Sequence, residues 1–518
     1  MNLGQIPIAN AARSPEALAF VDGEIRRNWF EFAEEIHQVA AGLRELGLSK
    51  GQHCVCIMPN RYETALTFFA CQMIGAIFTP FNWRATATEI EFIIKDAEAA
   101  LIVLDEKVSP AARQAAEISG IEKVVTLSGG ANEISFQYLL SCEACREISE
   151  IGEQDTCLML YTSGTTGRPK GVPRSQSSEL CAAMACISQL RFRRNDKSLG
   201  VMPLFHTMGV RVLLMSALLG GGWINMRRFD PADALRLISE EEINALFLVP
   251  TMYHDIVNTP SFSSVDRSSV RVLAYAGMSM TSSLEGKIRE EFSPDVFANY
   301  YGSSEIFTFS YCDDLEIKPG SAGWAGMGQV LRVIDLASHE AGHEITDVGI
   351  GEVGEVIASM QSPEAFSGYW KRPDADKKAI RDGWYFTGDL GFFDTDGALF
   401  LCGRIDDMII SGGENIDPEE VEDVLSKHEL VNLVAVVGEA DERWGQKVVA
   451  YIEPSSSNLT AKELDVFCKK SKLAAFKRPR KYVFVEKIPK SASGKLLRRL
   501  LREGDFVPLE GYDNGLNL

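Results

Sequence analysis

The chain has 518 residues, of which 46% are hydrophobic and 24% charged, and its formal net charge is −20 at pH 7. This length exceeds one ordinary domain, and the composition is typical of a soluble globular protein with two or three cores. The negative charge argues against a general nucleic-acid binder. The sign reverses locally, because residues 469–502 carry thirteen Lys or Arg and one acid, Glu486. This basic segment suggests a local anionic ligand.

No targeting segment is predicted. Residues 1–5 lack the basic and apolar regions of a signal peptide. The longest apolar stretch, 212–224, contains three glycines and is too short to span a bilayer. The eleven cysteines are scattered, mostly within apolar runs, which favours reduced thiols and a cytoplasmic protein.

Helical and strand patterns alternate over roughly residues 1–150. Hydrophobic periodicity predicts helices at 29–46, 62–73 and 89–97, and buried strands at 55–58 and 100–104. This βαβ rhythm predicts a largely parallel sheet. Residues 105–155 carry little signal.

The next segment concentrates glycines, hydroxyls and a lysine after an apolar run, 157–161, that predicts a buried strand. Glycines let backbone N–H groups approach an anion, hydroxyls add neutral donors, and Lys170 adds a point charge suited to phosphate. The pattern is not a Walker loop, because Lys170 lies three residues past the last loop glycine. A flexible surface turn would explain the glycines but not the lysine. The predicted phosphate loop comprises Thr162, Ser163, Gly164, Thr165, Thr166, Gly167 and Lys170.

This loop resembles the phosphate loop of adenylate-forming enzymes, the superfamily of acyl- and aryl-CoA ligases, peptide-synthetase adenylation domains and beetle luciferase. Companion motifs follow in the superfamily's order over roughly residues 20–502. They are Pro-Leu-Phe-His ending at His206, Tyr-Tyr-Gly-Ser-Ser-Glu ending at Glu305, Tyr-Phe-Thr-Gly-Asp ending at Asp389, Gly-Arg-x-Asp beginning at Gly403, and the Gly-Lys pair ending at Lys495. The sequences of residues 403–415 and 441–446 are similar to the corresponding segments of bacterial ligases of the 4-chlorobenzoate-CoA ligase type.

The resemblance implies an α/β protein in two parts. A large N-terminal domain of βαβ-type subdomains plus a small β region, residues 1–402, would bind AMP and the carboxylate. A small mobile α+β domain, residues 403–518, would follow, with its hinge at Asp406. Within it, the residue pattern predicts helices at 418–428 and 462–470, and strands near Val434, near Val448 and at 482–485.

The resemblance also implies a reaction in two steps. A carboxylate would attack the α-phosphate of Mg-ATP and release pyrophosphate, and the CoA thiol would then displace AMP from the acyl-adenylate. Lys495, Glu305 and His206 are the expected catalytic residues. An aromatic ring can stack on a purine, a hydroxyl can bind phosphate and a carboxylate can hold Mg²⁺.

Individual roles in the first step follow from the matching motifs. The phosphate loop would hold the β- and γ-phosphates, while Ser304 and Glu305 would take the α-phosphate and Mg²⁺. Lys495 would bridge the carboxylate and the α-phosphate. The nucleoside would be held by four residues, Tyr301 and Gly277 at adenine and Asp389 and Arg404 at ribose. The superfamily usually has Thr where this chain has Ser304, and the hydroxyl is kept.

In the second step, the small domain would turn about Asp406, withdraw Lys495 and bring Gly412 and Gly413 alongside a pantetheine tunnel. The residues that the resemblance assigns to CoA are Trp444, Phe476, Arg478, Arg480 and Arg84. These would account for the basic terminal segment.

The acyl pocket is expected to be apolar. Its candidate residues are Met184, His206, Thr207, Met208, Phe247, Tyr300, Gly302 and Phe307. No charge among them could pair with a second carboxylate, which favours an uncharged benzoate-like or short-to-medium aliphatic acid and disfavours dicarboxylates. A long-chain acid remains an alternative substrate, because a binding tunnel cannot be recognised from the sequence.

Other readings remain at this stage. The adenylate could pass to a carrier-protein phosphopantetheine instead of CoA, and a luciferase-like oxygenase or a non-catalytic relative are further alternatives. The oligomeric state is open, a homodimer being one alternative. The sequence His-Glu-Ala-Gly-His at 339–343 matches a zinc-protease pattern, but the glycine within it disfavours the helix that such a site needs.

Overall fold

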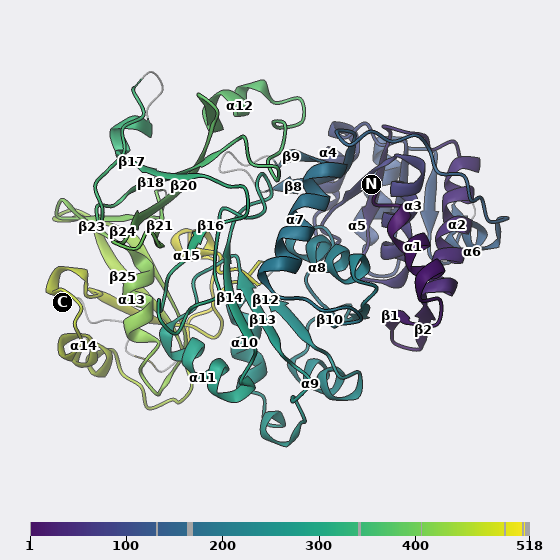
Figure 1. The fold of residues 1–518 in the computed structure, drawn as a ribbon. Coiled ribbons are helices and arrows are strands. Elements are labelled where there is room, and N and C mark those ends of the chain that lie inside the picture. Colours follow the sequence, from purple (N-terminus) through teal and green to yellow (C-terminus); the bar gives the residue numbers. More distant parts are fainter. Residues whose placement is uncertain are drawn as a thin grey trace.

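The computed structural model describes residues 2–130, 133–162, 169–339, 343–405, 407–491, 494–509 and 512. The described strands form four sheets, two of them large and mostly parallel, which confirms the α/β class. Figure 1 shows the N-terminal part at one end of an elongated molecule and the C-terminal part at the other.

The first sheet has seven strands in the order β7-β6-β5-β3-β4-β8-β9, all parallel except β9, which pairs antiparallel with β8. Its strands are β3 (His53–Ile57), β4 (Ile77–Pro80), β5 (Leu101–Leu104), β6 (Val124–Thr126), β7 (Ile134–Ser135), β8 (Thr156–Thr162) and β9 (Lys170–Ser175). The helices of this part of the chain are α2 (Trp29–Glu45), α3 (Tyr62–Ile74), α4 (Ala87–Asp96), α5 (Pro110–Ser119) and α6 (Phe136–Ser141). The five predicted elements are therefore confirmed. The weakly patterned residues 105–155 supply α5, β6, β7 and α6.

The second sheet has nine strands in the order β16-β15-β14-β13-β12-β10-β11-β1-β2. They are β1 (Leu18–Asp22), β2 (Ile25–Asn28), β10 (Lys197–Gly200), β11 (Gly222–Asn225), β12 (Ala245–Leu248), β13 (Val272–Ala276), β14 (Val296–Tyr301), β15 (Ser310–Cys312) and β16 (Trp324–Ala325). The helices are α1 (Gln5–Arg13), α7 (Gln176–Gln189), α8 (Thr207–Leu218), α9 (Pro231–Glu240), α10 (Pro250–Val257) and α11 (Ser282–Phe292). Because β1 pairs with β11, the N-terminal strand belongs to this later sheet. One hydrophobic cluster runs through both large sheets, so they share a core.

A smaller antiparallel sheet follows. It consists of β17 (Leu331–Ile334), β18 (Gly354–Ser359), β19 (Ile380–Arg381), β20 (Trp384–Phe393) and β21 (Leu399–Arg404), with α12 (Pro373–Ala379) beside it. This is the small β region that the sequence predicts. Glu340, Ala341 and Gly342 of the zinc-protease pattern fall outside the described residues.

The C-terminal part forms the fourth sheet and has its own hydrophobic clusters. Its elements are β22 (Ile409–Ser411), β23 (Glu414–Ile416), α13 (Pro418–Leu425), β24 (Val431–Asp441), β25 (Gly445–Pro454), α14 (Ala461–Lys470), β26 (Lys481–Phe484) and α15 (Arg498–Glu503). Helix α13 ends three residues earlier than predicted, because the backbone of 426–428 closes into a tight turn. Sheet membership changes between Arg404 and Ile409, an interval that contains Asp406, itself not described.

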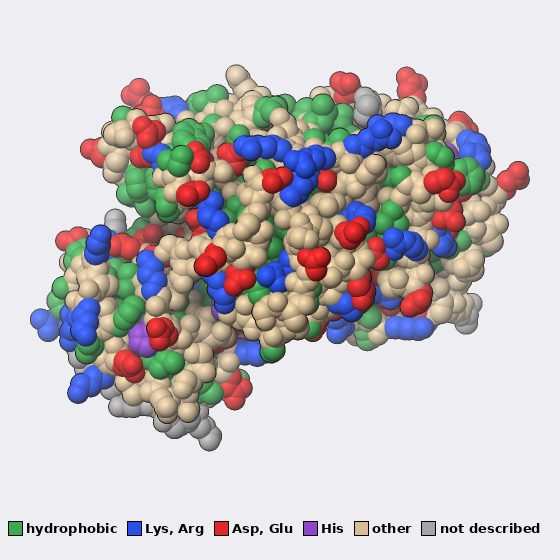
Figure 2. All heavy atoms as spheres, turned by 60° about the horizontal axis from the view of Figure 1, so that its bottom comes forward, with side chains coloured by type: hydrophobic (Ala, Val, Ile, Leu, Met, Phe, Trp, Pro, Cys, Tyr) green, Lys and Arg blue, Asp and Glu red, His purple; other side chains and the backbone are tan. Residues whose placement is uncertain are grey.

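The C-terminal part contacts the large part through polar groups. Ser282 at the start of α11 donates to Asp423 on α13 from both its backbone N–H, at 3.0 Å, and its hydroxyl, at 3.1 Å. Figure 2 shows the C-terminal part, which we call the C-terminal lobe, at the lower left, with Lys and Arg interspersed among Asp and Glu over the visible face. Among the described helices none is long and apolar enough to cross a membrane.

Candidate functional site

Two neighbouring parallel strands of the second sheet end at the centre of the site. Ala276 of β13 is opposite Tyr300 of β14, so Gly277 and Tyr301 lie side by side at the carboxyl ends of these strands. Ligands of open α/β sheets bind at such strand ends. Gly277 has a φ of +89°, which a side chain rarely tolerates. From the sequence, both residues are predicted to contact the adenine of a nucleotide, and the structure brings the two residues together.

Lys495 reaches this point from the C-terminal part of the chain. A Cβ added to Gly277 would lie 2.7 Å from Cε of Lys495, so the glycine leaves room for the lysine stem. The turn before Lys495 is fixed by Thr251 on α10, whose hydroxyl donates to the Gly494 carbonyl at 2.9 Å. Burial lowers the pKa of Lys495, and the nearby carboxylates of Asp389 and Glu305 partly oppose this.

Asp389, on β20, faces the same space. Its carboxylate accepts a hydrogen bond from the Tyr301 hydroxyl at 2.7 Å and pairs with Arg404 at 3.0 Å. Burial raises the pKa of Asp389, and the Arg404 guanidinium partly offsets the rise. The strand register explains the pair, because Asp389 lies directly opposite Arg404 in the antiparallel ladder.

Glu305 is buried, with 6% of its surface exposed. Its Oε1 accepts from the Tyr369 hydroxyl at 2.7 Å, and Lys170 Nζ lies 4.2 Å from the centre of the Tyr369 ring. Ser303 caps the turn by accepting from the backbone N–H groups of Glu305 and Ile306. The Glu305 carboxylate and the Lys170 ammonium group thus both contact the side chain of Tyr369.

The phosphate loop connects two antiparallel strands. Thr162 at the end of β8 is opposite Lys170 at the start of β9. Ser163, Gly164, Thr165, Thr166 and Gly167 lie outside the described residues. Burial lowers the pKa of Lys170, and Glu305 partly opposes this.

His206 precedes α8 and follows the end of β10. Burial, with a smaller effect of the positive charge of Lys495, lowers its pKa to about 3. The imidazole is therefore neutral at physiological pH, and its buried Nδ1 lacks a hydrogen-bond partner within the described part of the chain.

Three of the eight predicted acyl-pocket residues, Phe247, Tyr300 and Phe307, pack together as an aromatic cluster. Tyr300 packs against Phe247 and Phe307, with ring centres 5.3 and 6.4 Å away. The Tyr300 hydroxyl donates to Gln189 at 2.9 Å, which fixes the ring. At Gly302 a Cβ would lie 1.7 Å from the Phe307 carbonyl oxygen, so only glycine fits.

Thr207 and Met208 are buried at the start of α8, whereas Met184 on α7 is 57% exposed. Phe247 also lines a small internal void, together with apolar side chains such as Leu190 and Val212.

The residues assigned to CoA fall into two groups. On the C-terminal lobe, a Cβ added to Gly412 would lie 2.8 Å from the Trp444 ring, and the Arg480 guanidinium lies 5.7 Å from that ring. The Gly412-Gly413 turn is exposed, and Phe476 is 41% exposed. Arg478 is instead engaged within the lobe, paired with Asp465 at 2.9 Å.

Arg84, on the large part, lines a groove of about 290 Å³ that is also lined by Lys490 and Gly494 of the C-terminal lobe. Its guanidinium lies 4.3 Å from the Trp83 ring, and that of Arg228 lies 5.0 Å from the same ring. Burial and the positive charge of Arg228 lower the pKa of Arg84. The groove is lined by four basic side chains, Arg84, Arg227, Arg228 and Lys490, and by one acid, Asp255, and is therefore cationic.

The profile of the AMP-binding enzyme family matches residues 8–370, and that of the AMP-binding enzyme C-terminal domain matches residues 420–495. The chain belongs to the AMP-binding enzyme family. It is 33% identical over 500 residues to a 4-chlorobenzoate–CoA ligase of Arthrobacter sp., covering 95% of this chain and 93% of the relative. It is 32% identical over 509 residues to a long-chain-fatty-acid–CoA ligase of Mycobacterium tuberculosis, covering 97% and 98%.

Among solved structures, an anthranilate CoA ligase in complex with anthranoyl-AMP superimposes with a TM-score of 0.89 at 26% identity, covering 98% of this chain and 97% of that one. These matches place this AMP-binding enzyme in the acyl- and aryl-CoA ligase branch, as the motifs predict. It is an AMP-forming ligase that uses ATP and CoA and acts through an acyl-adenylate.

Sequence reasoning missed several residues of this AMP-binding enzyme's site. Tyr369 holds Glu305 and Thr251 holds the lysine turn, and the sequence assigned neither residue a role. Arg174, Glu179 and Arg211 are buried charges in apolar surroundings. The available signals were an arginine directly after the run Gly171-Val172-Pro173 and an arginine within the apolar α8.

Proposed function

We propose that this enzyme activates an uncharged carboxylic acid, benzoate-like or short-to-medium aliphatic, and transfers it to free CoA. The observation that carries the proposal is the position of Lys495 against Gly277, beside Asp389, Glu305 and His206. A cation from the C-terminal lobe at the strand ends fits the adenylating step, in which negative charge develops at the α-phosphate.

In the first step, a carboxylate oxygen bonds to the α-phosphorus of ATP while the bond to the bridging oxygen of pyrophosphate breaks. Lys495 holds the carboxylate and an α-phosphate oxygen together, which is catalysis by positioning and charge. Tyr301 and Gly277 hold adenine. Asp389, oriented by Tyr301 and Arg404, accepts hydrogen bonds from the ribose hydroxyls.

The phosphates belong at the other end of the site. Ser304 makes no side-chain hydrogen bond with the part of the chain that is described, so its hydroxyl is available to an α-phosphate oxygen. Lys170, with Thr162 across the strand pair and the intervening loop, takes the β- and γ-phosphates. His206, neutral because of its burial, stays at the acyl end of the site as a hydrogen-bonding group.

Glu305 fits a Mg²⁺ that is bound jointly by protein and nucleotide. Within the described residues no cluster of three or more His, Cys, Asp or Glu could hold a metal ion. Mg²⁺ in nucleotide sites usually takes one or two carboxylates plus substrate phosphates, which suits a single buried carboxylate near Lys170. When bound, Mg²⁺ neutralises phosphate charge.

The aromatic cluster supports an uncharged and compact acyl group. Phe247, Tyr300 and Phe307 form a rigid wall, because the Tyr300 hydroxyl is tied to Gln189. Arg211, a buried cation beside the Phe307 ring, already pairs with Glu179 at 3.0 Å, which disfavours its pairing with a second carboxylate.

The cationic groove supports free CoA as the acceptor. Arg84 and Arg228 flank Trp83 and suit the phosphates of the CoA nucleotide, since Arg binds phosphate strongly and Trp can stack on a base. The pantetheine thiol attacks the acyl carbonyl, the bond to the AMP oxygen breaks, and AMP leaves as the thiol proton is released. We infer that the lobe turns about Asp406 between the steps, withdraws Lys495 and brings in Gly412 and Gly413, a hinge motion.

Pyrophosphate release across a panel of aromatic and aliphatic carboxylates, with and without CoA, tests the proposal. We expect sustained turnover with one class of uncharged acid only when CoA is present. A single stoichiometric burst that CoA does not relieve would keep adenylation and reject CoA in favour of a carrier protein. Turnover with dicarboxylates alone would reject the proposed acyl class.

A further inference from the structure

A fully buried ionic triad lies beside the site. Glu179 on α7 accepts from Arg174 Nε at 2.8 Å and from Arg211 Nη2 at 3.0 Å, and the three side chains are 0–1% exposed. Burial acts to raise the pKa of Glu179, but the two guanidiniums hold it below its usual value. Such triads are costly to bury and are often no more stable than apolar side chains of similar volume. Stability alone is therefore a weak reason for this one.

Arg174 extends from the triad to the backbone of Glu305. Its Nη1 donates to the Glu305 carbonyl at 2.9 Å and to the Glu364 carbonyl at 2.7 Å. The Glu305 carbonyl also accepts from the Phe366 N–H at 2.9 Å. Arg174 belongs to the same strand, β9, as Lys170. One guanidinium thus ties the strand that leaves the phosphate loop to the residue proposed to hold Mg²⁺.

Arg211 extends the triad toward the acyl pocket. It lies on α8, which begins at Thr207, and its guanidinium carbon is 4.5 Å from the centre of the Phe307 ring. Its Nη1 donates to the Glu179 carbonyl. The acyl wall and the Glu305 segment therefore share one buried set of charges.

We propose that Arg174 is a positioning residue for the adenylation step, held by Glu179 and acting through the backbone of Glu305. It sets the place of the Glu305 carboxylate relative to Lys170. This inference rests on the proposed function, whose first half-reaction it refines. Its effect is confined to adenylation, because Mg²⁺ held at Glu305 would assist the release of pyrophosphate, and transfer from a preformed adenylate releases none.

Arg174→Lys is the direct test, because lysine keeps the charge but cannot bond Glu179, Glu305 and Glu364 together. We expect pyrophosphate release in a single turnover to fall at least tenfold, and the affinity for Mg-ATP, measured by calorimetry, to fall severalfold. Thioester formation from supplied benzoyl-adenylate should stay within about twofold. Glu179→Asp, which keeps all charges, should shift the same measurements in the same direction by less and serves if Arg174→Lys does not fold.

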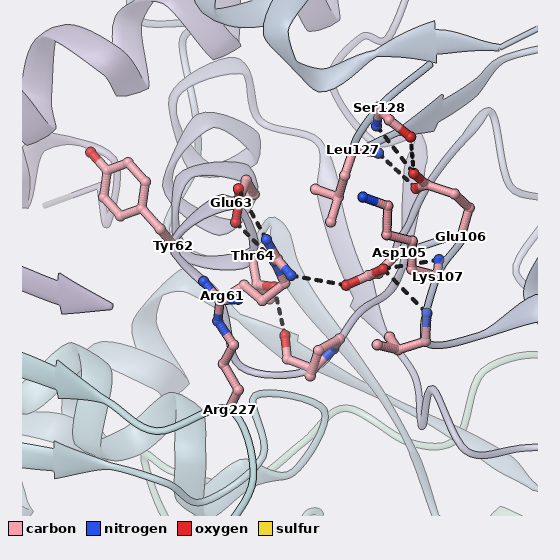
Figure 3. A network of polar contacts seen from close by, with 12 residues as sticks. Arg61, Tyr62, Glu63, Thr64, Asp105, Glu106, Lys107, Leu127, Ser128 and Arg227 are labelled. Carbon is pink, nitrogen blue, oxygen red and sulfur yellow. Dashed lines mark hydrogen bonds and ion pairs between the residues drawn. The ribbon is translucent and has the colours of Figure 1, made fainter. Parts of the chain in front are cut away.

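Arg61 provides a matched control. It lies between Glu63 and Asp105, with N–O distances of 3.1 Å to each, and Figure 3 shows this network at the strand ends of the first sheet. Arg61→Lys should lower thermal stability without a selective loss in either half-reaction. If Arg174→Lys behaves in the same way, with equal losses in both halves, the triad is only structural and the inference fails.

A double-mutant cycle with Glu305→Gln asks whether Arg174 acts through Glu305. In the Glu305→Gln background, Arg174→Lys should cost less than threefold more in pyrophosphate release. Full additivity of the two losses would overturn the proposed route. The parent enzyme is the reference in every comparison, so a parent that releases no pyrophosphate with any acid rejects the proposed function and not the role of Arg174.

Discussion

Gly277→Ala tests the contact that places Lys495 in the site. The added Cβ would lie 2.7 Å from Cε of Lys495, closer than side chains approach, and the φ of +89° strains any residue with a side chain. The backbone strain costs about 1–3 kcal/mol. The steric effect pushes the lysine away, and a displacement of about 1 Å at a reacting centre costs on the order of 10²-fold in rate.

We expect adenylation, followed as pyrophosphate release in a single turnover, to fall about 10²-fold. Thioester formation from supplied acyl-adenylate should fall less than tenfold, because Lys495 is then withdrawn. Gly383→Ala is the matched control, since Gly383 has a φ of +79° and no atom within 4 Å of the added Cβ. It should share the loss of stability and keep both half-reactions. Unchanged adenylation in Gly277→Ala would refute the placement of Lys495, and equal losses in both halves would refute its restriction to the first step.

Further predictions concern the lysine, the hinge and an acid of the C-terminal lobe. Lys495→Ala should lower the rate of adenylation by at least about 10²-fold and spare thioester formation from supplied acyl-adenylate. An equal loss of rate in both half-reactions would contradict this. Asp406→Pro should do the reverse by freezing the hinge, and normal overall turnover would remove Asp406 from that role. Burial lowers the pKa of Lys495, so the lysine loses its charge at a pH below its ordinary pKa of about 10.4. The rate of adenylation by the parent should therefore decline as the pH rises through that lowered pKa. The rate of thioester formation should show no such decline. Burial, with Glu419 nearby, raises the pKa of Asp417 to about 7. Its protonated form is therefore favoured in the folded state, and the parent loses stability as pH rises from about 4 to 7. Asp417→Asn keeps an acceptor for the Glu419 N–H and should add stability above pH 7, up to about 4 kcal/mol, but little at pH 4. A pH-independent difference in urea unfolding would exclude this cause.

The sequence predicted the elements that have strong local signals. The amphipathic stretch after Asn28 and the apolar run before the phosphate loop became α2 and β8, because periodicity and capping are local properties. The order of motifs predicted the family, which the profile and relatives confirm. Short elements within 105–155 escaped prediction, since their burial depends on neighbours supplied by the rest of the sheet.

The residue types at the strand ends were thus determined by the sequence alone. The chemical properties of a glycine at 277, a carboxylate at 305 and a lysine at 495 follow from the residue types, wherever the chain places them. Only the tertiary structure decided that Lys495 meets Gly277, since 218 positions separate them and the contact depends on how the C-terminal lobe docks on α10 and α11. It also decided the triad of Arg174, Glu179 and Arg211. The apolar neighbours of Arg174 and Arg211 in the sequence hint at burial, but only packing brings the three charges together, removes water from them and so makes each depend on the others.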